Sequence, residues 1–280
     1  MASVKRMDLD VIVCAKNRAE MLERVLQQII REIPFRELIV IYASSEDRTR
    51  EVAEKYTKKV FWDEDKGLGA ARNLGIRKAT SELVAMIDTD VFLTKGWTER
   101  LLKHFDDPRV AAVMGTKIYG YGFLPIQRLS EYWRWSRSEN WDCSNTIFRR
   151  DFVLEVGNFD ETIRGAGEDY DLYKRILAAG YRWMWDREVV VYHPMTFFEY
   201  LNHLSWWEKS APRIQELIAQ VRTYSLFRIY CRSAYSILNA FQEGIRLSVK
   251  VHPTVLFIRP MFQVVAETTQ LRELKKMLSS

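Results

Sequence analysis

The sequence predicts an α/β protein, a parallel sheet flanked by helices, with a helical extension at the C-terminus. Three observations predict this fold. Over the first 194 residues, short apolar runs rich in β-branched residues alternate with longer stretches of helical periodicity, as in crossover units around a parallel sheet. Acidic residues directly follow one of these runs, at the strand end where open α/β sheets bind their ligands. Beyond residue 195, apolar residues recur at spacings of three and four, which indicates helices.

The individual elements follow from this alternation. The runs that predict strands are Asp10–Ala15, Leu38–Tyr42, Val60–Trp62, Leu83–Ile87, Val110–Met114 and Glu188–Tyr192. The stretches that predict helices are Glu20–Arg31, Asp47–Lys58, Gly69–Ala79, Trp97–Phe105, Asp151–Val156 and Asp169–Ala179. A loop rich in Gly and aromatic residues is expected from Gly115 to Trp141. We therefore expect one domain over residues 1–195 and a helical, basic and aromatic region over residues 196–280.

Composition narrows the class of protein. The chain has 280 residues, 48% of them hydrophobic and 28% charged, which excludes a disordered, collagenous or coiled-coil chain. Its three cysteines, Cys14, Cys143 and Cys231, lie far apart and lack the spacing of a zinc site or a disulfide framework. The first apolar run is shorter than the core of a signal peptide. We expect a cytoplasmic location.

The positive charge is concentrated at the C-terminus. Residues 1–194 hold 31 basic and 31 acidic residues, so the net charge of +5 comes from the remainder. Between Leu217 and Ala266 there are six basic residues and one acid, Glu243. This balance suits an anionic membrane surface or a nucleic acid, and equally a solvated helix face. The neutral first part argues against a broad nucleic-acid surface. No run reaches the ~18 apolar residues that span a bilayer, so membrane association would be peripheral.

Two acidic motifs could carry chemistry. Asp88-Thr89-Asp90 ends an apolar strand, and alternate residues of an extended chain point the same way, so both carboxylates could reach one divalent cation. Glu168-Asp169 begins a predicted helix, where the dipole favours an ionised carboxylate that can accept a proton. Taken singly, the first could be a solvated turn and the second a helix cap. His193, at the end of the last strand, could be a metal ligand or a buried histidine.

Taken in order along the chain, the motifs resemble glycosyltransferase family 2, the inverting nucleotide-diphosphosugar transferases with the GT-A fold. The matching segments lie within residues 8–194. They are Lys16-Asn17-Arg18-Ala19-Glu20, Lys66-Gly67-Leu68-Gly69-Ala70-Ala71-Arg72-Asn73-Leu74-Gly75-Ile76, Ile87-Asp88-Thr89-Asp90, Phe148-Arg149-Arg150, Val156-Gly157-Asn158-Phe159-Asp160-Glu161 and Glu168-Asp169-Tyr170-Asp171-Leu172. The resemblance implies a Rossmann-like, mixed and mostly parallel sheet flanked by helices. It also implies an enzyme that moves one sugar from a nucleotide-diphosphate sugar to an acceptor.

The resemblance also implies roles for individual residues. Asp169, with Glu168 beside it, corresponds to the base that deprotonates the acceptor hydroxyl. Asp90 corresponds to a ligand of the Mg²⁺ or Mn²⁺ that bridges the donor phosphates, with Asp88 contacting the ribose or the metal and His193 completing the metal shell. The nucleotide-binding positions are Ala15, Asn17, Arg18, Ser44, Arg72 and Asp88.

The sequence departs from the family pattern after the second predicted strand. Many members have Asp-Asp-Gly-Ser there, whereas this chain has Tyr42-Ala43-Ser44-Ser45-Glu46-Asp47. Ser44 could still hydrogen-bond a base edge, but the choice between a uridine and a guanosine donor stays open. The Gln-x-x-Arg-Trp signature of processive synthases is absent after Asp169, so we expect a non-processive enzyme.

The acceptor side is less defined. Aromatic residues crowd the segment between the two acidic motifs, where they could stack on sugars or pack in the core: Tyr119, Tyr121, Phe123, Tyr132, Trp133, Trp135 and Trp141. Aromatic residues also accompany the basic ones in the C-terminal helices, a mixture typical of the membrane headgroup region. We therefore expect a glycan or lipid-linked acceptor, such as a polyprenyl phosphate, used at the cytoplasmic face of the cell membrane.

Two other functions are compatible with the sequence. A sugar nucleotidyltransferase shares the core fold, but such enzymes usually have a Gly-rich loop with Arg and Lys after the first strand, where this chain has Cys14-Ala15-Lys16-Asn17-Arg18. A nucleotide-sugar-binding or adaptor module without transfer activity would keep the α/β domain and use the basic tail to bind a partner. The transferase fits the motifs best.

Overall fold

The computed structural model describes residues 8–120, 124–163, 165–209 and 226–279. Tyr121, Phe123 and the first part of the predicted C-terminal helical pattern, at residues 214–221, lie outside this range.

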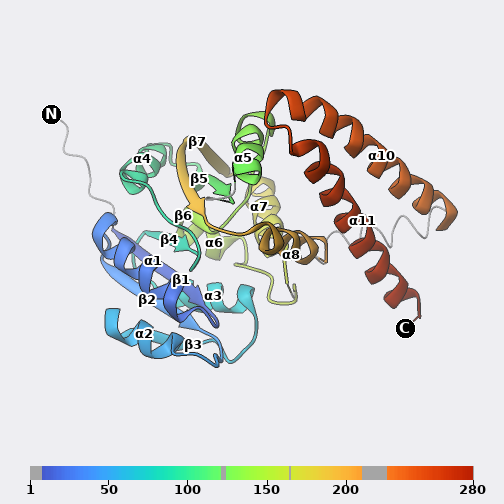
Figure 1. Cartoon of the computed structure of the whole chain (residues 1–280). Helices are drawn as coiled ribbons and strands as arrows, with labels where there is room; N and C mark the ends of the chain where they lie inside the picture. Colours follow the sequence, from blue (N-terminus) through green and yellow to red (C-terminus); the bar gives the residue numbers. More distant parts are fainter. Residues whose placement is uncertain (1–7, 121–123, 164, 210–225, 280) are drawn as a thin grey trace. The chain divides into compact units, whose positions relative to one another are not determined.

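Figure 1 labels the elements. The strands within the described residues are β1 (Leu9–Ala15), β2 (Glu37–Tyr42), β3 (Lys59–Trp62), β4 (Leu83–Ile87), β5 (Val110–Tyr119), β6 (Asn145–Arg149) and β7 (Arg182–His193). The helices are α1 (Ala19–Glu32), α2 (Thr49–Tyr56), α3 (Leu68–Lys78), α4 (Trp97–Leu102), a 3₁₀ turn η1 (Lys103–Asp106), α5 (Leu124–Ser136), α6 (Arg150–Glu155), α7 (Glu168–Ala178), α8 (Phe197–Glu208), α10 (Leu226–Lys250) and α11 (Val255–Ser279).

The strands form one mixed sheet in the order β3-β2-β1-β4-β6-β5-β7. β1 pairs in parallel with β2 and β4, and β2 pairs in parallel with β3. β6 is antiparallel to both β4 and β5. The predicted fold class, a mostly parallel sheet flanked by helices with a helical C-terminal part, is confirmed.

One prediction along the chain is wrong, and one strand was not predicted. The segment from Gly115 to Trp141 is not a continuous loop, because β5 extends to Tyr119 and α5 occupies Leu124–Ser136. The sequence analysis also missed β6, a short strand that lies between β4 and β5. Only Ile147 and Phe148 in β6 are large and apolar, so its strand pattern is weak without its neighbours.

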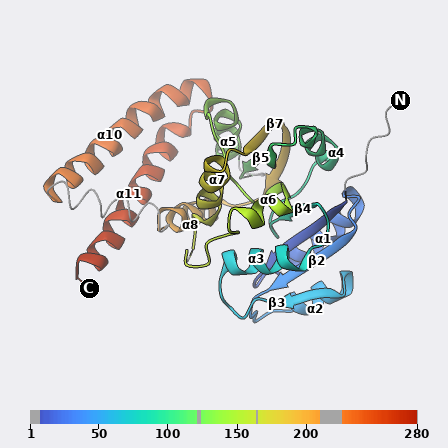
Figure 2. The same ribbon diagram turned by 180° about the vertical axis from the view of Figure 1, so that it is seen from behind.

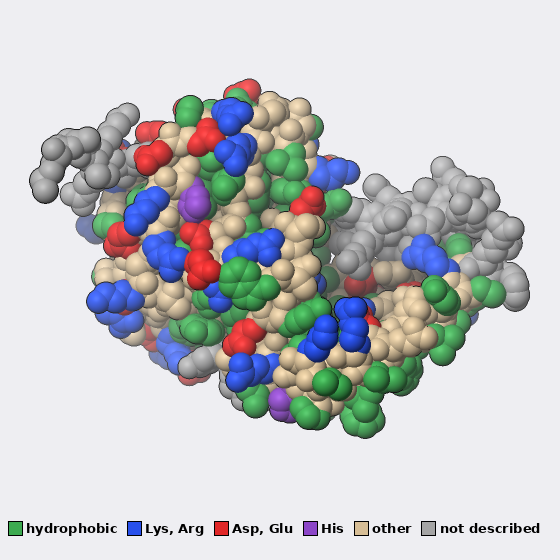
Figure 3. All heavy atoms as spheres, turned by 90° about the horizontal axis from the view of Figure 1, so that it is seen from above, with side chains coloured by type: hydrophobic (Ala, Val, Ile, Leu, Met, Phe, Trp, Pro, Cys, Tyr) green, Lys and Arg blue, Asp and Glu red, His purple; other side chains and the backbone are tan. Residues whose placement is uncertain are grey.

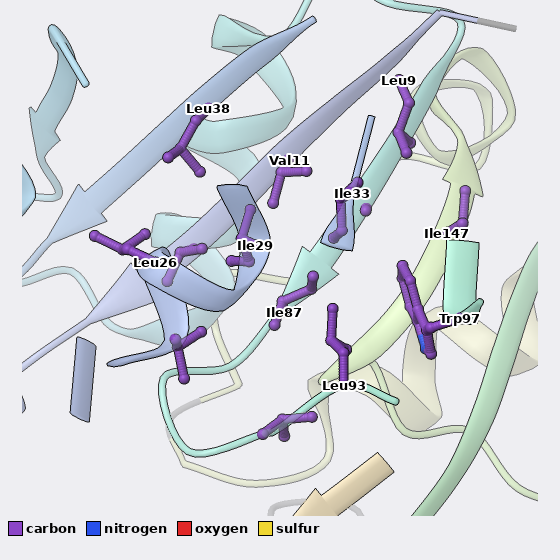
Figure 4. Packing of buried hydrophobic residues seen from close by; sticks show 14 of the residues in the cluster. Leu9, Val11, Leu26, Ile29, Ile33, Leu38, Ile87, Leu93, Trp97 and Ile147 are labelled. Atoms are coloured by element: carbon purple, nitrogen blue, oxygen red, sulfur yellow. The ribbon is translucent and has the colours of Figure 1, made fainter. Parts of the chain in front are cut away.

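Helices cover both faces of the sheet, as the two opposite views show (Figures 1 and 2). Alternate residues of β1 point to opposite faces, as expected for a strand. Val11 and Val13 pack with residues of α1, α2 and α4, and Figure 4 shows part of this cluster around α1. Ile12 packs on the other face with residues of α3, α6 and α7. Fully apolar strands such as β4 are therefore buried from both sides.

α3 approaches β1 closely because of one glycine. A Cβ atom added at Gly75 would collide with the side chain of Ile12. The missing side chain lets α3 lie directly on the sheet, and this fixes the position of Arg72, three residues earlier on the same helix.

The chain forms two compact units. One comprises the residues up to Ile118 together with Arg137–Thr162 and Glu168–His193, and it contains the sheet. The other comprises Tyr119–Ser136, Ile163–Gly167 and the chain from Pro194 onward. The second unit has its own core, formed by residues of α5, α8, α10 and α11.

Among the described residues, none of the helices has the length and apolar character that crossing a bilayer requires. The division at residue 195 stays a prediction.

The close packing of α3 on β1 gives a test. Gly75→Ala should lower the free energy of unfolding by about 1 kcal/mol or more, because overpacking costs ~1–3 kcal/mol and exceeds the gain in helix propensity. Urea unfolding measures the change. In an Ile12→Ala background, which removes the obstructing side chain, the same substitution should cost less. Equal costs in the two backgrounds would contradict the proposed contact.

Candidate active site

The two aspartates of the first motif lie immediately beyond β4. The backbone N–H of Asp88 donates to the carbonyl oxygen of Ser144, at 3.0 Å, which ties this turn to the residue preceding β6. The Asp88 side chain is about one third exposed, and that of Asp90 is 16% exposed. Both carboxylates therefore lie at the carboxyl end of a buried central strand, where a ligand from solvent can reach them.

Arg72 connects this motif to the start of α7. Its side chain is buried, at 5% exposure, and its guanidinium donates to Glu168 Oε1 at 2.5 Å. The other terminal nitrogen lies 3.4 Å from Asp88 Oδ1. Because a guanidinium is rigid and always charged, one side chain fixes two acidic segments that lie 80 residues apart in the chain.

Glu168 and Asp169 occupy the first turn of α7. Glu168 is buried, and its second oxygen, Oε2, has no hydrogen-bond partner among the described residues. Burial and the neighbouring charge of Glu168 raise the pKa of Asp169 from 3.8 to about 7, although Arg72 partly opposes the shift. A carboxylate with such a pKa can accept and release a proton near neutral pH.

Asp90 has the opposite electrostatic environment. His193, the last residue of β7, places its Nε2 at 3.2 Å from Asp90 Oδ1, and Arg18 places a guanidinium nitrogen at 3.9 Å from Oδ2. Burial alone would raise the pKa of Asp90, but the hydrogen bond and charge of His193, with Lys117 and Arg18, hold it well below the usual range. Asp90 therefore stays ionised.

Lys117 and Asp142 also belong to the site, although neither was predicted from the sequence. Lys117 lies near the end of β5, and its Nζ is 2.7 Å from Asp142 Oδ2 and 2.9 Å from the hydroxyl of Ser144. Burial would raise the pKa of Asp142, but Lys117 holds it below its usual value. The positive charge of Lys117 also acts on Asp88 and Asp90. A single lysine after an apolar run gave no signal of this role.

The nucleotide-binding positions predicted on the first two loops are tied together by hydrogen bonds. Asn17 has a positive φ of 49°, its N–H donates to the hydroxyl of Ser45 at 3.1 Å, and its side-chain oxygen accepts from the N–H of Glu46 at 2.8 Å. The N–H of Ala43 donates to the carbonyl oxygen of Ala15. These contacts fix the loop that positions Arg18.

Ser44 is already engaged within the protein. Its hydroxyl donates to Asp65 Oδ2 at 2.5 Å, and its N–H donates to Asp65 Oδ1 at 2.9 Å. The hydroxyl oxygen keeps its capacity to accept a hydrogen bond, so contact with a base edge would require a donor on the base. The predicted role of Ser44 stays a prediction.

Carboxyl groups outnumber cationic side chains at the site. Five carboxylates gather there: Asp88, Asp90, Asp142, Glu168 and Asp169. Arg72 and Lys117 are the buried cations among them. The described residues contain no group of three or more His, Cys, Asp and Glu side chains arranged to hold a metal ion. Asp90 and His193 do face each other, and a divalent ion that also binds substrate phosphates needs only one or two carboxylates from the protein. The donor set fits such an ion.

Two of the aromatic residues expected near an acceptor, Tyr119 and Trp141, pack against other aromatic side chains. Tyr119 makes edge-to-face contacts with Tyr200 and Trp207, with ring centroids 5.9 Å and 5.6 Å apart. Trp141 packs on Tyr170 with centroids 4.7 Å apart. Trp135 is 58% exposed. Core packing thus accounts for Tyr119 and Trp141.

The raised pKa of Asp169 predicts a pH-dependent effect on stability. In the folded chain Asp169 keeps its proton up to about pH 7, whereas in the unfolded chain it loses the proton near pH 4. The free energy of unfolding therefore falls as the pH rises between these two values. Asp169→Asn should therefore raise the free energy of unfolding more at pH 8 than at pH 4. The difference should be on the order of 1 to 2 kcal/mol, which is less than the full pKa shift would give, because the side chain of Asp169 is only partly buried.

Asp171→Asn, in the same helical turn, is the matched control. It removes the ion pair between Asp171 and Arg175, whose atoms lie 2.6 Å apart, and should give no gain at high pH. Urea unfolding at the two pH values measures both variants. An Asp169→Asn gain that is equal at both values would contradict the raised pKa.

Comparisons with known proteins agree with this geometry. The model of the family described as glycosyl transferase family 2 matches residues 10–175. A pre-mycofactocin glycosyltransferase of Mycobacterium tuberculosis is 34% identical over 143 residues, which cover 46% of this chain and 30% of the relative. A glucosyl-dolichyl phosphate glucuronosyltransferase of Haloferax volcanii is 24% identical over 251 residues, which cover 76% of this chain and 78% of the relative.

A solved structure has the same fold. The mannosyltransferase PcManGT from Pyrobaculum calidifontis, in complex with GDP-Man and Mn²⁺, superposes with a TM-score of 0.67 at 20% identity, covering 96% of this chain and 88% of that one. The chain spans less than a third of the length of the mycobacterial relative. The family match covers more than half of the chain and includes both acidic motifs and Arg72. The chain belongs to glycosyl transferase family 2.

Proposed function

We propose that this chain is an inverting glycosyltransferase that moves one sugar from a nucleotide-diphosphate sugar to an acceptor. One observation carries the proposal. The buried guanidinium of Arg72 joins Asp88 beyond β4 to Glu168 at the start of α7, and Asp90 faces His193 in the same site. The opposite pKa shifts of Asp169 and Asp90 agree with a proton acceptor beside a cation-binding group. Membership of the family and the likeness to a mannosyltransferase fold support the same activity.

The donor would bind across the carboxyl ends of β1, β2 and β4. Arg18, Arg72 and Asp88 lie around this edge, with Ala15 at the end of β1 and Asn17 and Ser44 on the adjoining loops. The nucleotide is a UDP or a GDP, and PcManGT, which shares the fold, holds GDP-Man. A positive guanidinium near the departing diphosphate would stabilise its developing charge.

The donor diphosphate would bring Mg²⁺ or Mn²⁺ with it. Asp90 and His193 would hold the ion, with Asp88 beside them, and PcManGT contains Mn²⁺. A bound divalent ion supplies positive charge that stabilises the leaving phosphates. The excess of carboxylates at the site supports this requirement for a cation.

Asp169 would remove the proton from the acceptor hydroxyl as its oxygen attacks the anomeric carbon from the face opposite the leaving group. The bond from the acceptor oxygen to that carbon forms while the bond to the phosphate oxygen breaks, so the configuration inverts. Glu168 precedes Asp169 in the first turn of α7 and is held by Arg72. Burial and the neighbouring Glu168 raise the pKa of Asp169, so Glu168 would act by positioning and tuning the base.

We also propose a lipid-linked acceptor, such as a polyprenyl phosphate or a glycan built on one, used by a non-processive enzyme peripheral to the cytoplasmic face of the cell membrane. Asp169 would serve as the base for a glycan hydroxyl, whereas a polyprenyl phosphate is already an anion and would need no base. The relative from Haloferax volcanii is named for a glucosyl-dolichyl phosphate, which supports an acceptor of this class. The proposed domain division assigns catalysis to residues 1–195 and attachment to residues 196–280.

The base assignment predicts a specific kinetic result. Asp169→Asn keeps the size of the side chain but removes its ability to accept a proton, so turnover onto a hydroxyl acceptor should fall by roughly 10²–10⁴-fold. Donor binding should change little, because Asp169 lies on α7 and not at the ends of β1 and β2. Sugar transfer and donor affinity measured on the same preparation check both expectations.

The control Asp171→Asn, two residues further along α7, should retain most of the activity because the Asp171 side chain pairs with Arg175. Full activity of Asp169→Asn on a hydroxyl acceptor would contradict the base assignment. Inactivity of the wild-type chain with every sugar nucleotide, although it is folded, would contradict the transferase proposal and favour an adaptor.

A further inference from the structure

The outer face of α10 exposes a long row of large apolar side chains. Six of them are between 49% and 88% exposed: Tyr230, Tyr235, Leu238, Phe241, Ile245 and Val249. At 3.6 residues per turn they fall within an arc of about 140° and run for about 30 Å along the helix. We name this row the α10 stripe. Soluble surfaces rarely keep so continuous an apolar row without a partner.

The opposite face of α10 is packed against protein. Ile229, Ala240 and Leu247 are buried there. A Cβ atom at Gly244 would lie 3.0 Å from the carbonyl oxygen of Leu256, so α10 and α11 are in close contact. The α10 stripe therefore points away from α11, and the hairpin cannot cover it.

Basic residues border the α10 stripe along one edge. Arg232, Arg246 and Lys250 lie within about 60° of Tyr235 around the helix and are exposed. The one acid of α10, Glu243, is 2.7 Å from Arg259 of α11 and so is already neutralised. Figure 3 shows hydrophobic (green) and Lys or Arg (blue) side chains together on the surface in this part of the chain.

We propose that the α10 stripe and its basic edge form a surface that lies in the headgroup region of an anionic membrane. An amphipathic helix with an apolar face and Lys or Arg at its border binds such an interface in the plane of the bilayer. The stripe belongs to a helix that is not apolar enough to cross a membrane, in keeping with contact from one side. The inference rests on the proposed peripheral location and assigns it to one face of one helix.

The charges favour a membrane over a second copy of the chain. If two stripes packed antiparallel about Phe241, Arg232 of one copy would lie opposite Lys250 of the other. Like charges would then face each other along the border of the contact, which is unfavourable. Anionic headgroups would neutralise the same residues. The charge pattern thus selects lipid as the occupant.

Flotation of the full chain with vesicles tests the proposal. The wild type should float with vesicles of equal parts phosphatidylcholine and phosphatidylglycerol, and much less with phosphatidylcholine alone. Arg246→Gln with Lys250→Gln should lower the partition coefficient by about fivefold for each charge removed. Leu238→Glu with Ile245→Glu should abolish flotation.

The matched control is Ile30→Glu with Leu177→Glu. These residues are also exposed aliphatic side chains on helices, at 50% and 43%, but they lie on α1 and α7. This variant should float like the wild type. Circular dichroism of each variant verifies that it is folded.

Three results would overturn the proposal. The first is wild-type protein that fails to float with the anionic vesicles, and the second is a double variant, Leu238→Glu with Ile245→Glu, that floats as well as the wild type. The third is a wild-type chain that is a dimer in solution while this double variant is a monomer. Flotation needs no donor, metal or acceptor. Transfer to a water-soluble acceptor in vesicle-free buffer therefore tests the proposed enzyme separately, and either experiment can fail without the other.

Discussion

The site depends on the two ion pairs made by the buried guanidinium of Arg72. This guanidinium lies between Glu168 at the start of α7 and Asp88 at the end of β4, and thus joins the two acidic motifs. A buried ion pair contributes little net stability, but removing one partner leaves an uncompensated charge that costs about 3–5 kcal/mol. The pair therefore specifies geometry more than it adds stability. Its position in turn depends on Gly75, which lets α3 lie against Ile12 of β1.

The electrostatics of the site follow from this arrangement. Arg72 donates to one oxygen of Glu168, and the other oxygen is buried without a described partner. The burial of Asp169 and the neighbouring charge of Glu168 raise the pKa of Asp169. On the other side, His193, Lys117 and Arg18 keep Asp90 ionised. One site thus holds a proton acceptor poised near neutral pH and a permanent anion that attracts a cation.

The sequence predicted the strands whose residues form apolar runs. β1, β2 and β4 are such runs, buried on both faces of the sheet, so they can be recognised without knowing their neighbours. The acidic motifs could be recognised because one follows a strand and the other begins a helix. β6 could not be predicted, because two apolar residues among polar ones form a strand only between β4 and β5.

The pairing of Lys117 with Asp142 had no local signal either. It arises from the antiparallel register of β5 and β6, in which Met114 lies opposite Thr146, so that the chain beyond brings Lys117 next to Asp142. Partners of this kind, far apart in sequence and joined by sheet register, require the three-dimensional structure. The α10 stripe is a further example. The sequence predicts a helix with an apolar face there, but only the structure shows which face α11 covers.

We expect the edge formed by β1, β2 and β4 to bind a nucleoside diphosphate together with a divalent cation. Calorimetric titration with UDP and with GDP, each with and without Mn²⁺, measures this binding. One of the two nucleotides should bind only with Mn²⁺, and Asp90→Ala should weaken this binding strongly, while Asp171→Asn should leave it unchanged. Binding of neither nucleotide to the folded chain, or binding that is indifferent to both Mn²⁺ and Asp90, would contradict it.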